Sequence, residues 1–177
     1  AIPVVDRFQT CVPGIYAIGD AVKGSIQLAH AAAAQGINAV SILAGKEPPM
    51  DLSVVPSCVY VRPEMASVGR TEAQCKEAGI SVKTAKYLTG SNSRSVITDA
   101  GRGFIKVAYD GETGVVLGAQ LLCERATVLV GEFASAISRG ETLEDMARVI
   151  HAHPTFAEAV GEAAEAGLGL SIHQLKR

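Results

Sequence analysis

The sequence lacks paired cysteines. Its four thiols are 47, 17 and 48 residues apart, at Cys11, Cys58, Cys75 and Cys123. They form no Cys-x-x-Cys pair and have no histidine at the spacing of a zinc motif. This pattern predicts reduced, partly buried thiols in a cytoplasmic protein, with no metal ion and no redox-active dithiol in the chain.

The sequence also lacks an excess of either charge, since 16 basic and 18 acidic side chains give a net charge of -2. Such a balance provides no electrostatic footprint for nucleic acid or for an anionic membrane. Residues 24–45 carry no formal charge, but they are rich in alanine and interrupted by polar residues. A buried helix is therefore expected there, and a membrane span is not.

Nucleotide-binding fingerprints are missing as well. Neither the dinucleotide pattern G-x-G-x-x-G nor a P-loop occurs in the 177 residues. The chain starts at Ala1 in strand-like sequence, with no basic stretch before an apolar segment. We expect no signal peptide, and we interpret the chain as the C-terminal part of a longer protein that holds the pyrophosphate-binding half of any cofactor site elsewhere.

Residues 1–50 have the pattern of half an α/β nucleotide-binding unit. A short apolar strand at 15–18 ends at Gly19 and Asp20, and a helix rich in small residues begins near Ile26. A polar segment broken by prolines, 46–51, follows the helix. We therefore expect residues 1–50 to be the last strand-helix piece of an α/β domain.

Residues 51–177 predict a second domain of the α+β class. Alternating patterns indicate five strands near 57–62, 65–69, 82–88, 103–109 and 115–122. The last two should form a hairpin, turned by 110–114 with its glycines at positive φ. Helices are expected at 71–78, from Ala126, after a capping box of Thr142 with Asp145, and from Thr155. The prediction is an antiparallel sheet with helices on one side.

The most informative segment is 151–158. Pro154 suits the first positions of a helix, so His153 should project just ahead of regular structure. Glu158 lies in the first turn, and helical side chains lean toward the N-terminus, which brings its carboxylate back to the ring. A carboxylate on one ring nitrogen fixes the tautomer and leaves the other nitrogen for proton transfer. His153 and Glu158 thus form a candidate base with its orienting acid.

An ordinary structural explanation competes with a catalytic role for His153 and Glu158. Thr155-x-x-Glu158 also fits a capping box, and from spacing alone capping is favoured over catalysis, although the two roles are compatible. His151, two residues earlier, is expected to be a hydrogen-bonded structural histidine.

A second candidate site follows the strand at 15–18. An acid at the carboxyl end of a parallel strand points into the crevice where α/β proteins bind nucleotides, so Asp20 could accept hydrogen bonds from sugar or polyol hydroxyls. The next helix would direct free amides at the same place, with Leu28, Ala29 and His30 in or near its first turn. Without further information, an ordinary turn acid is the commoner explanation.

Several motifs, in order, resemble a known family. Residues 10–21 resemble the second flavin-binding motif of the FAD-dependent pyridine nucleotide-disulfide oxidoreductases. Four segments are similar to the C-terminal interface domain of that family: 55–56, 63–69, 117–119 and 153–158. Segments 28–30, 151–154 and 169–173 most resemble the branch that oxidises dihydrolipoamide to lipoamide. Gln35 and Arg62 depart from the usual pattern, because an acid and a His or Thr, respectively, are more familiar there.

The resemblance implies a division of labour in the whole protein. FAD and a redox-active cysteine pair would lie in a preceding domain, NAD in a central one, and residues 51–177 would form the homodimer interface. His153, oriented by Glu158, would reach the partner subunit's disulfide and take a proton from a dihydrolipoamide thiol. A cis bond at His153-Pro154 is also implied.

For the flavin, the resemblance assigns Asp20 to the ribityl chain and the backbone of Leu28, Ala29 and His30 to the pyrimidine edge, with Gly19 and Ala21 also in the cofactor site. The partners would be lipoyl domains of 2-oxoacid dehydrogenase or glycine cleavage complexes. We expect the chain alone to be inactive. A sibling disulfide reductase, similar to glutathione reductase, and a non-catalytic dimerisation module remain the alternatives.

Overall fold

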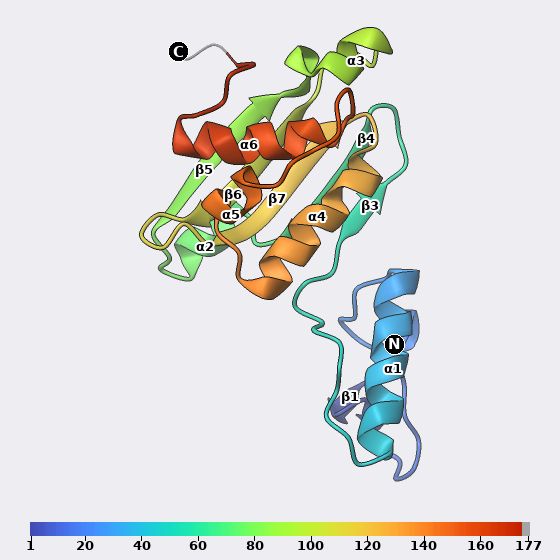
Figure 1. Cartoon of the computed structure of the whole chain (residues 1–177). Coiled ribbons are helices and arrows are strands. Elements are labelled where there is room, and N and C mark those ends of the chain that lie inside the picture. The colour runs from blue at the N-terminus through green and yellow to red at the C-terminus, as the bar shows by residue number, and fades with distance from the viewer. Residues whose placement is uncertain (175–177) are drawn as a thin grey trace. The chain divides into compact units, whose positions relative to one another are not determined.

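The computed structural model describes residues 1–174, which form two compact units, one from Ala1 to Val55 and one starting at Pro56 (Figure 1). The second unit is the larger, and it contains the sheet, the long helices that cover it and the segment 151–158.

The second unit is built on a five-stranded antiparallel sheet of order β3-β4-β7-β6-β5. Its strands are β3 (Ser57–Val59), β4 (Glu64–Gly69), β5 (Val82–Leu88), β6 (Phe104–Asp110) and β7 (Val116–Cys123). The predicted hairpin is present, with Phe104 opposite Leu122 and Val107 opposite Ala119. The α+β prediction is therefore confirmed.

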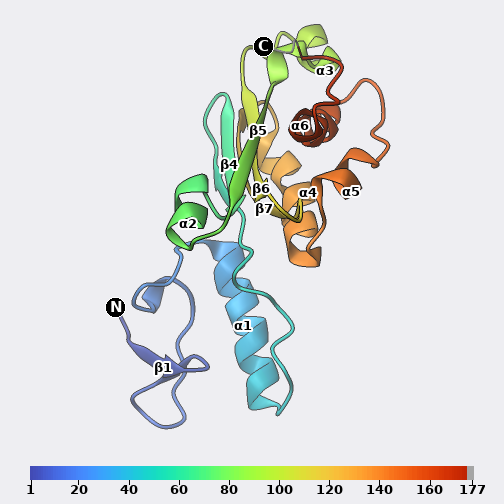
Figure 2. The ribbon, with the colours of Figure 1, turned by 90° about the vertical axis from the view of Figure 1, so that its left-hand side faces the viewer.

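Three helices cover one face of this sheet: α4 (Ala126–Arg139), α5 (Leu143–Ala147) and α6 (Glu158–Leu168) (Figure 2). The expected capping box of Thr142 and Asp145 opens α5. The short helix α2 (Glu72–Glu77) lies on the opposite face, where Glu72 accepts a hydrogen bond from Lys106 of β6 at 2.7 Å. A further short helix, α3 (Ser93–Ile97), follows the 3-10 turn η2 (Thr89–Ser91) after β5 and was not predicted.

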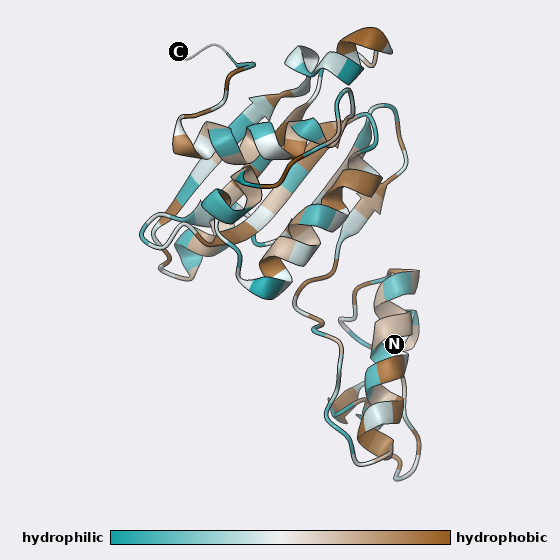
Figure 3. Ribbon diagram, viewed as in Figure 1, coloured by the Kyte–Doolittle hydropathy of each residue, from teal (hydrophilic) through white to brown (hydrophobic). Residues whose placement is uncertain are grey.

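The core lies between the sheet and these helices. Side chains alternate along the strands, so that Ile105 and Val107 of β6 are fully buried while Lys106 points to the other face. Phe133 of α4 and Val160 of α6 are also fully buried and belong to the helix side of this core. In Figure 3 the same alternation appears as brown and teal segments along the strands. Because α6 packs on the sheet through these buried side chains, the sheet determines where α6 begins.

The hairpin turn differs from the prediction in one respect. Gly114 has φ +77°, as expected, but Gly111 does not have a positive φ. Gly111 is required for space instead, because a Cβ there would lie 2.8 Å from the carbonyl oxygen of Ser81. The Asp110 carboxylate completes the turn by accepting hydrogen bonds from the amides of Glu112 and Thr113.

The first unit contains a two-stranded ribbon, β1 (Val4–Asp6) with β2 (Gln9–Thr10), the 3-10 turn η1 (Gly19–Ala21) and helix α1 (Ala29–Leu43). The predicted strand at 15–18 is wrong: only an isolated antiparallel bridge between Gln9 and Tyr16 is present. A strand requires a ladder of partners, and residues 1–55 supply only that bridge for Tyr16.

Helix α1 begins at Ala29, three residues later than expected, because Ile26 and Leu28 still lie in the preceding turn. Its apolar residues include Ile37, Val40 and Leu43, all exposed in this unit. Brown and teal bands accordingly alternate along the helix in Figure 3. Among residues 1–174, no helix is both long and apolar enough to cross a membrane.

Candidate active site

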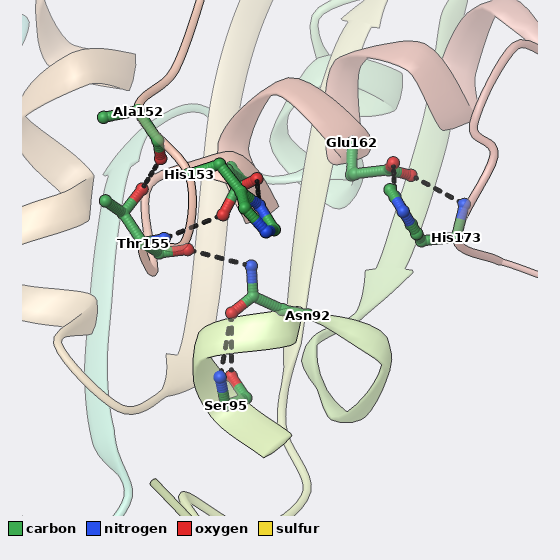
Figure 4. Close-up of polar contacts among 8 residues, drawn as sticks. Asn92, Ser95, Ala152, His153, Thr155, Glu162 and His173 are labelled. Atoms are coloured by element: carbon green, nitrogen blue, oxygen red, sulfur yellow. Dashed lines mark hydrogen bonds and ion pairs between the residues drawn. The ribbon is translucent and has the colours of Figure 1, made fainter. Parts of the chain in front are cut away.

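The loop before α6 brings His153 and Glu158 together (Figure 4). His153 Nδ1 lies 2.8 Å from Glu158 Oε1, and the other carboxylate oxygen, Oε2, accepts a hydrogen bond from the Thr155 amide at 2.7 Å. Each carboxylate oxygen of Glu158 thus makes one contact, one with the imidazole ring and one with the Thr155 amide. The peptide bond between His153 and Pro154 is cis, as the resemblance implied.

The capping box itself is only half formed. Helix α6 begins at Glu158, three residues after the predicted start, and its N-cap is Ala157. The Thr155 hydroxyl donates to the Ala152 carbonyl at 2.7 Å, and no side-chain hydrogen bond caps the N-terminus of the helix. Glu158 therefore holds the loop more than it caps the helix, which fixes the backbone that carries His153.

A second element, which the sequence analysis missed, supports this loop. The Asn92 amide donates to the Thr155 carbonyl at 3.0 Å, while its oxygen accepts from the Ser95 amide and hydroxyl at the start of α3. Asn92 and Ser95 are both buried. An asparagine before a serine-rich turn is a recognised N-cap signal, and it could have revealed α3, but not the contact with Thr155.

The environment of the pair favours an ionised acid beside an accessible ring. Burial alone would raise the pKa of Glu158, whose side chain is 24% exposed, but the Thr155 amide, the hydrogen bond and charge of His153 and the charge of His173 together lower it. The His153 side chain is 68% exposed, and no group within residues 1–174 bonds its Nε2. The free nitrogen is therefore available to exchange a proton with another molecule.

His151 has a structural role, as predicted. Its Nε2 lies 3.0 Å from Glu132 Oε1 of α4, and its side chain is only 11% exposed. Gly161 of α6 packs against the ring, since a Cβ there would approach Nδ1 to 3.1 Å.

A polar pocket of about 180 Å³ adjoins the pair. Its walls include Glu158 and His151, together with Tyr87, Asn92, Glu162 and His173. The sequence analysis did not select Glu162 or His173 as site residues. They lie one helical turn and 15 residues after Glu158, respectively, and only folding brings the three together.

The flavin candidates lie in the first unit. Gly19 is buried, adopts φ +67° and packs on α1, where a Cβ would stand 3.0 Å from Cβ of Ala32. Its amide donates to Gln35 Oε1 at 2.7 Å. Asp20 and Ala21 complete the turn η1 with both side chains exposed. The structure therefore brings Gly19, Asp20 and Ala21 onto the face of the helix that carries Gln35.

Helix α1 starts without a side-chain hydrogen bond from its N-cap residue. Leu28 is the N-cap in an extended conformation and makes no side-chain cap, so the helix begins at Ala29 and His30 without a capping oxygen from Leu28. The backbone amides at the N-terminus of a long helix can bind an electron-rich group of a ligand. Arg62, the other unusual residue, is exposed and precedes Pro63 in a cis bond at the start of β4.

The unusual Gln35 has a specific role that can be tested. Besides accepting from Gly19, it donates to the Ser25 hydroxyl at 3.0 Å and so ties the turn before α1. Gln35→Leu leaves the Gly19 amide without a partner, and we expect a loss of about 1–3 kcal/mol in the stability of this turn. Amide exchange at Gly19 measures it. In Gln35→Glu a carboxylate can accept from both groups, so exchange should stay slow; equal exchange in both variants would contradict this role.

Neither a disulfide nor a cluster of metal ligands occurs in residues 1–174. All four cysteines are free, and burial with the nearby Glu64 and Glu124 raises the pKa of Cys123 to about 12. Residues 1–174 contain no group of three side chains suited to a metal ion.

Comparison with known proteins points to one family. Residues 55–164 match the dimerisation domain of the pyridine nucleotide-disulphide oxidoreductases, and residues 1–36 match the pyridine nucleotide-disulphide oxidoreductase model. The chain is 44% identical over 176 residues to a dihydrolipoyl dehydrogenase of Haloferax volcanii, covering 99% of this chain and 37% of that protein. It is 46% identical to the mitochondrial dihydrolipoyl dehydrogenase of Canis lupus familiaris, with 97% and 34% covered.

Solved structures agree with these relatives. LpdA of Mycobacterium tuberculosis superposes with a TM-score of 0.84 at 29% identity, covering 93% of this chain and 36% of that one. The flavoprotein disulfide reductase RclA of Escherichia coli, induced by HOCl, gives 0.83 at 26% identity, with 92% and 38% covered. The chain spans little more than a third of the length of the relatives it matches.

Proposed function

The chain belongs to the pyridine nucleotide-disulphide oxidoreductase family, and on this basis we propose that the whole protein is a dihydrolipoyl dehydrogenase. It would oxidise dihydrolipoamide to lipoamide with FAD and NAD. This chain would supply the homodimer interface, in residues 51–177, and the acid-base pair His153 and Glu158. Residues 1–50 would complete its FAD-binding domain. The free thiols suit a reducing compartment such as the cytoplasm.

The observation that supports this function best is the 2.8 Å contact of His153 Nδ1 with Glu158 Oε1, which leaves Nε2 open. A thiolate attacks a disulfide far faster than a thiol does. His153 Nε2 would take the proton from a dihydrolipoamide thiol, and the sulfur would then attack one sulfur of the redox disulfide and release the other as a thiolate. Glu158, kept ionised, would stabilise the imidazolium formed in this step.

The disulfide that receives this attack would belong to the partner subunit. None of the four cysteines of this chain has a partner thiol, and two of them, Cys75 and Cys123, are buried. A homodimer in which each His153 serves the other subunit would explain why a dimerisation domain carries the acid-base pair. It also predicts that this chain is inactive by itself.

The residues of the first unit fit part of an FAD site. Asp20 presents an exposed carboxylate on a turn that Gln35 fixes, and the N-terminus of α1 at Leu28, Ala29 and His30 has no side-chain cap from Leu28. Asp20, with Gly19 and Ala21, would hold the ribityl hydroxyls, and the start of the helix would face the pyrimidine edge. The flavin, when bound, supplies the acceptor for the electrons of the dithiol.

Two alternatives remain in view. A relative from Glycine max that is 44% identical over 165 residues is named leghemoglobin reductase, so a sibling reductase with another substrate is a real competitor. The other is a dimerisation module in which Glu158 only fixes the loop. Lipoyl domains of 2-oxoacid dehydrogenase or glycine cleavage complexes would be partners under the first proposal only.

A substrate panel tests the function directly. The whole protein with FAD should oxidise dihydrolipoamide with NAD, and its turnover of glutathione disulfide and mercuric ion should be lower by orders of magnitude. The 177-residue chain alone, assayed at the same concentration, should give no turnover above the rate without protein. A preference for glutathione disulfide would favour the sibling reductase, and turnover by the isolated chain would contradict the proposed division of labour.

A further inference from the structure

A second histidine-glutamate pair lies one turn further along α6. The Glu162 carboxylate is only 9% exposed, and His173 Nδ1 lies 2.5 Å from its Oε1. Its Oε2 accepts from the Ser171 hydroxyl at 2.5 Å and, more weakly, from the His173 amide at 3.4 Å. Figure 4 shows Glu162 and His173 facing each other further along α6 than His153 and the 151–155 loop. A buried carboxylate is thus satisfied entirely by the segment after α6.

This segment, Gly169–Gln174, is also attached to the sheet. The Gln174 side chain accepts from the Leu88 amide at 3.1 Å and donates to the Lys86 carbonyl at 3.0 Å, so it pairs with the free edge of β5 as a strand would. His173 is therefore fixed from both sides, by Glu162 and by its neighbour Gln174. Its ring has a defined position even though its side chain is 54% exposed.

The two pairs share one pocket. Glu158, Glu162 and His173 all line the cavity of about 180 Å³, together with His151 and Tyr87 of β5, whose pKa is raised by burial and by both acids. The remaining charged groups there are Glu165 of α6 and, bonded to His151, Glu132 of α4. Burial raises the pKa of both Tyr87 and Glu165, so the tyrosine stays neutral and Glu165 takes up its proton at a higher pH than usual on acidification.

We propose that His173, held by Glu162, is a positioning residue of the acid-base site. Its protonated ring balances the negative charge of the pocket and keeps Glu158 ionised under acidic conditions in which the carboxylate would otherwise begin to protonate. The effect of His173 on turnover rests on the proposed role of Glu158, but the electrostatic link between the His173 charge and Glu158 does not.

The physical basis is the crowding of carboxylates on one helix face. Glu158 and Glu162 are four residues apart, a spacing at which like charges repel and favour protonation of one of them. A cation beside Glu162 cancels that repulsion. An imidazole ordinarily gains its charge below about pH 6.5, before a carboxyl begins to protonate. The charge of His173 accordingly acts to lower the pKa of Glu158.

Titration of Glu158 tests the link in the 177-residue chain. The Cδ chemical shift of Glu158 would be followed against pH in the wild type and in His173→Asn, whose amide can still donate to Glu162 but carries no charge. The titration midpoint of Glu158 should move upward in the variant, by roughly a few tenths of a pH unit for a partly screened charge. Ser171→Ala, which removes a hydrogen bond from the same segment without changing charge, should leave the midpoint in place.

Each outcome decides the proposal. An unchanged midpoint in His173→Asn overturns it, and so does an equal rise in Ser171→Ala, since the effect would then come from loosening the segment. In the whole protein, His173→Asn should also move the acidic limb of the pH–rate profile upward. If Glu158 shifts in the isolated chain but that limb does not move, the electrostatic link stands and the proposed role of Glu158 in turnover fails.

Discussion

Glu158→Gln is expected to leave the whole protein folded and to lower its turnover of dihydrolipoamide by roughly 10²–10⁴-fold, the usual range for an acid-base group. The glutamine oxygen can still accept from the Thr155 amide, so the loop is retained. An amide cannot stabilise the imidazolium that forms on His153, and it can support the wrong tautomer of the ring. Steady-state kinetics with dihydrolipoamide and NAD would measure the loss.

The matched control is Asp145→Asn. Asp145 accepts from the Thr142 amide at 2.9 Å at the start of α5, much as Glu158 accepts from Thr155, but no histidine contacts it. The amide oxygen of this variant can still accept from Thr142, so the stability loss should stay below the roughly 0.5–2 kcal/mol of a truncated capping residue, and turnover should be kept. If the two variants behave alike, Glu158 only fixes the loop and the dimerisation module is the better description.

A variant with both His153→Gln and Glu158→Gln tests whether the two residues act together in turnover or contribute independently. His153→Gln removes the base itself, so adding Glu158→Gln to it should cost little more. Groups that act as a unit show such non-additive losses, whereas independent contributions multiply. A double variant slower than His153→Gln by the full factor of Glu158→Gln would mean that Glu158 acts on turnover by a route other than the ring.

The sequence predicted those features that depend on neighbours along the chain. The β6–β7 hairpin follows from two alternating segments and a five-residue turn, and the contact of His153 with Glu158 follows from five residues of separation at a helix start. The resemblance added the cis bond at Pro154, which no periodicity could indicate. Assigning roles to these residues depended on the family, because spacing alone favoured capping.

Features made by distant residues were missed. Asn92 reaches Thr155 across 63 positions, and Gln174 reaches Leu88 across 86. No local pattern encodes such contacts, since each partner is an ordinary polar residue in its own segment. The strand expected at 15–18 failed for the related reason that a strand is defined by its neighbours, and this chain provides one bridge there. The site was thus predictable only as far as it is local.

Gly118→Ala is expected to destabilise the second unit by about 3 kcal/mol or more, because overpacking against rigid neighbours is costly. A Cβ at this position would lie 2.0 Å from the carbonyl oxygen of Arg70, and within 3 Å of two further backbone atoms of that residue. Gly118 pairs with Gly69 where β4 and β7 meet, and the Arg70 amide donates to the Leu117 carbonyl at 2.8 Å. The backbone can therefore yield only by breaking the sheet. Urea unfolding of the chain would measure the change.

Gly131→Ala, in the same unit, is expected to stabilise the fold instead of destabilising it. Gly131 lies inside α4, and a Cβ there would meet nothing within 4 Å. Alanine is favoured over glycine in a helix by about 0.8–1 kcal/mol, so this variant should be more stable than the wild type. The two glycine-to-alanine changes should thus shift the urea midpoint in opposite directions. A small effect at Gly118 would mean that the Arg70 backbone can move, and that the β4–β7 junction beneath α4 is softer than its close packing indicates.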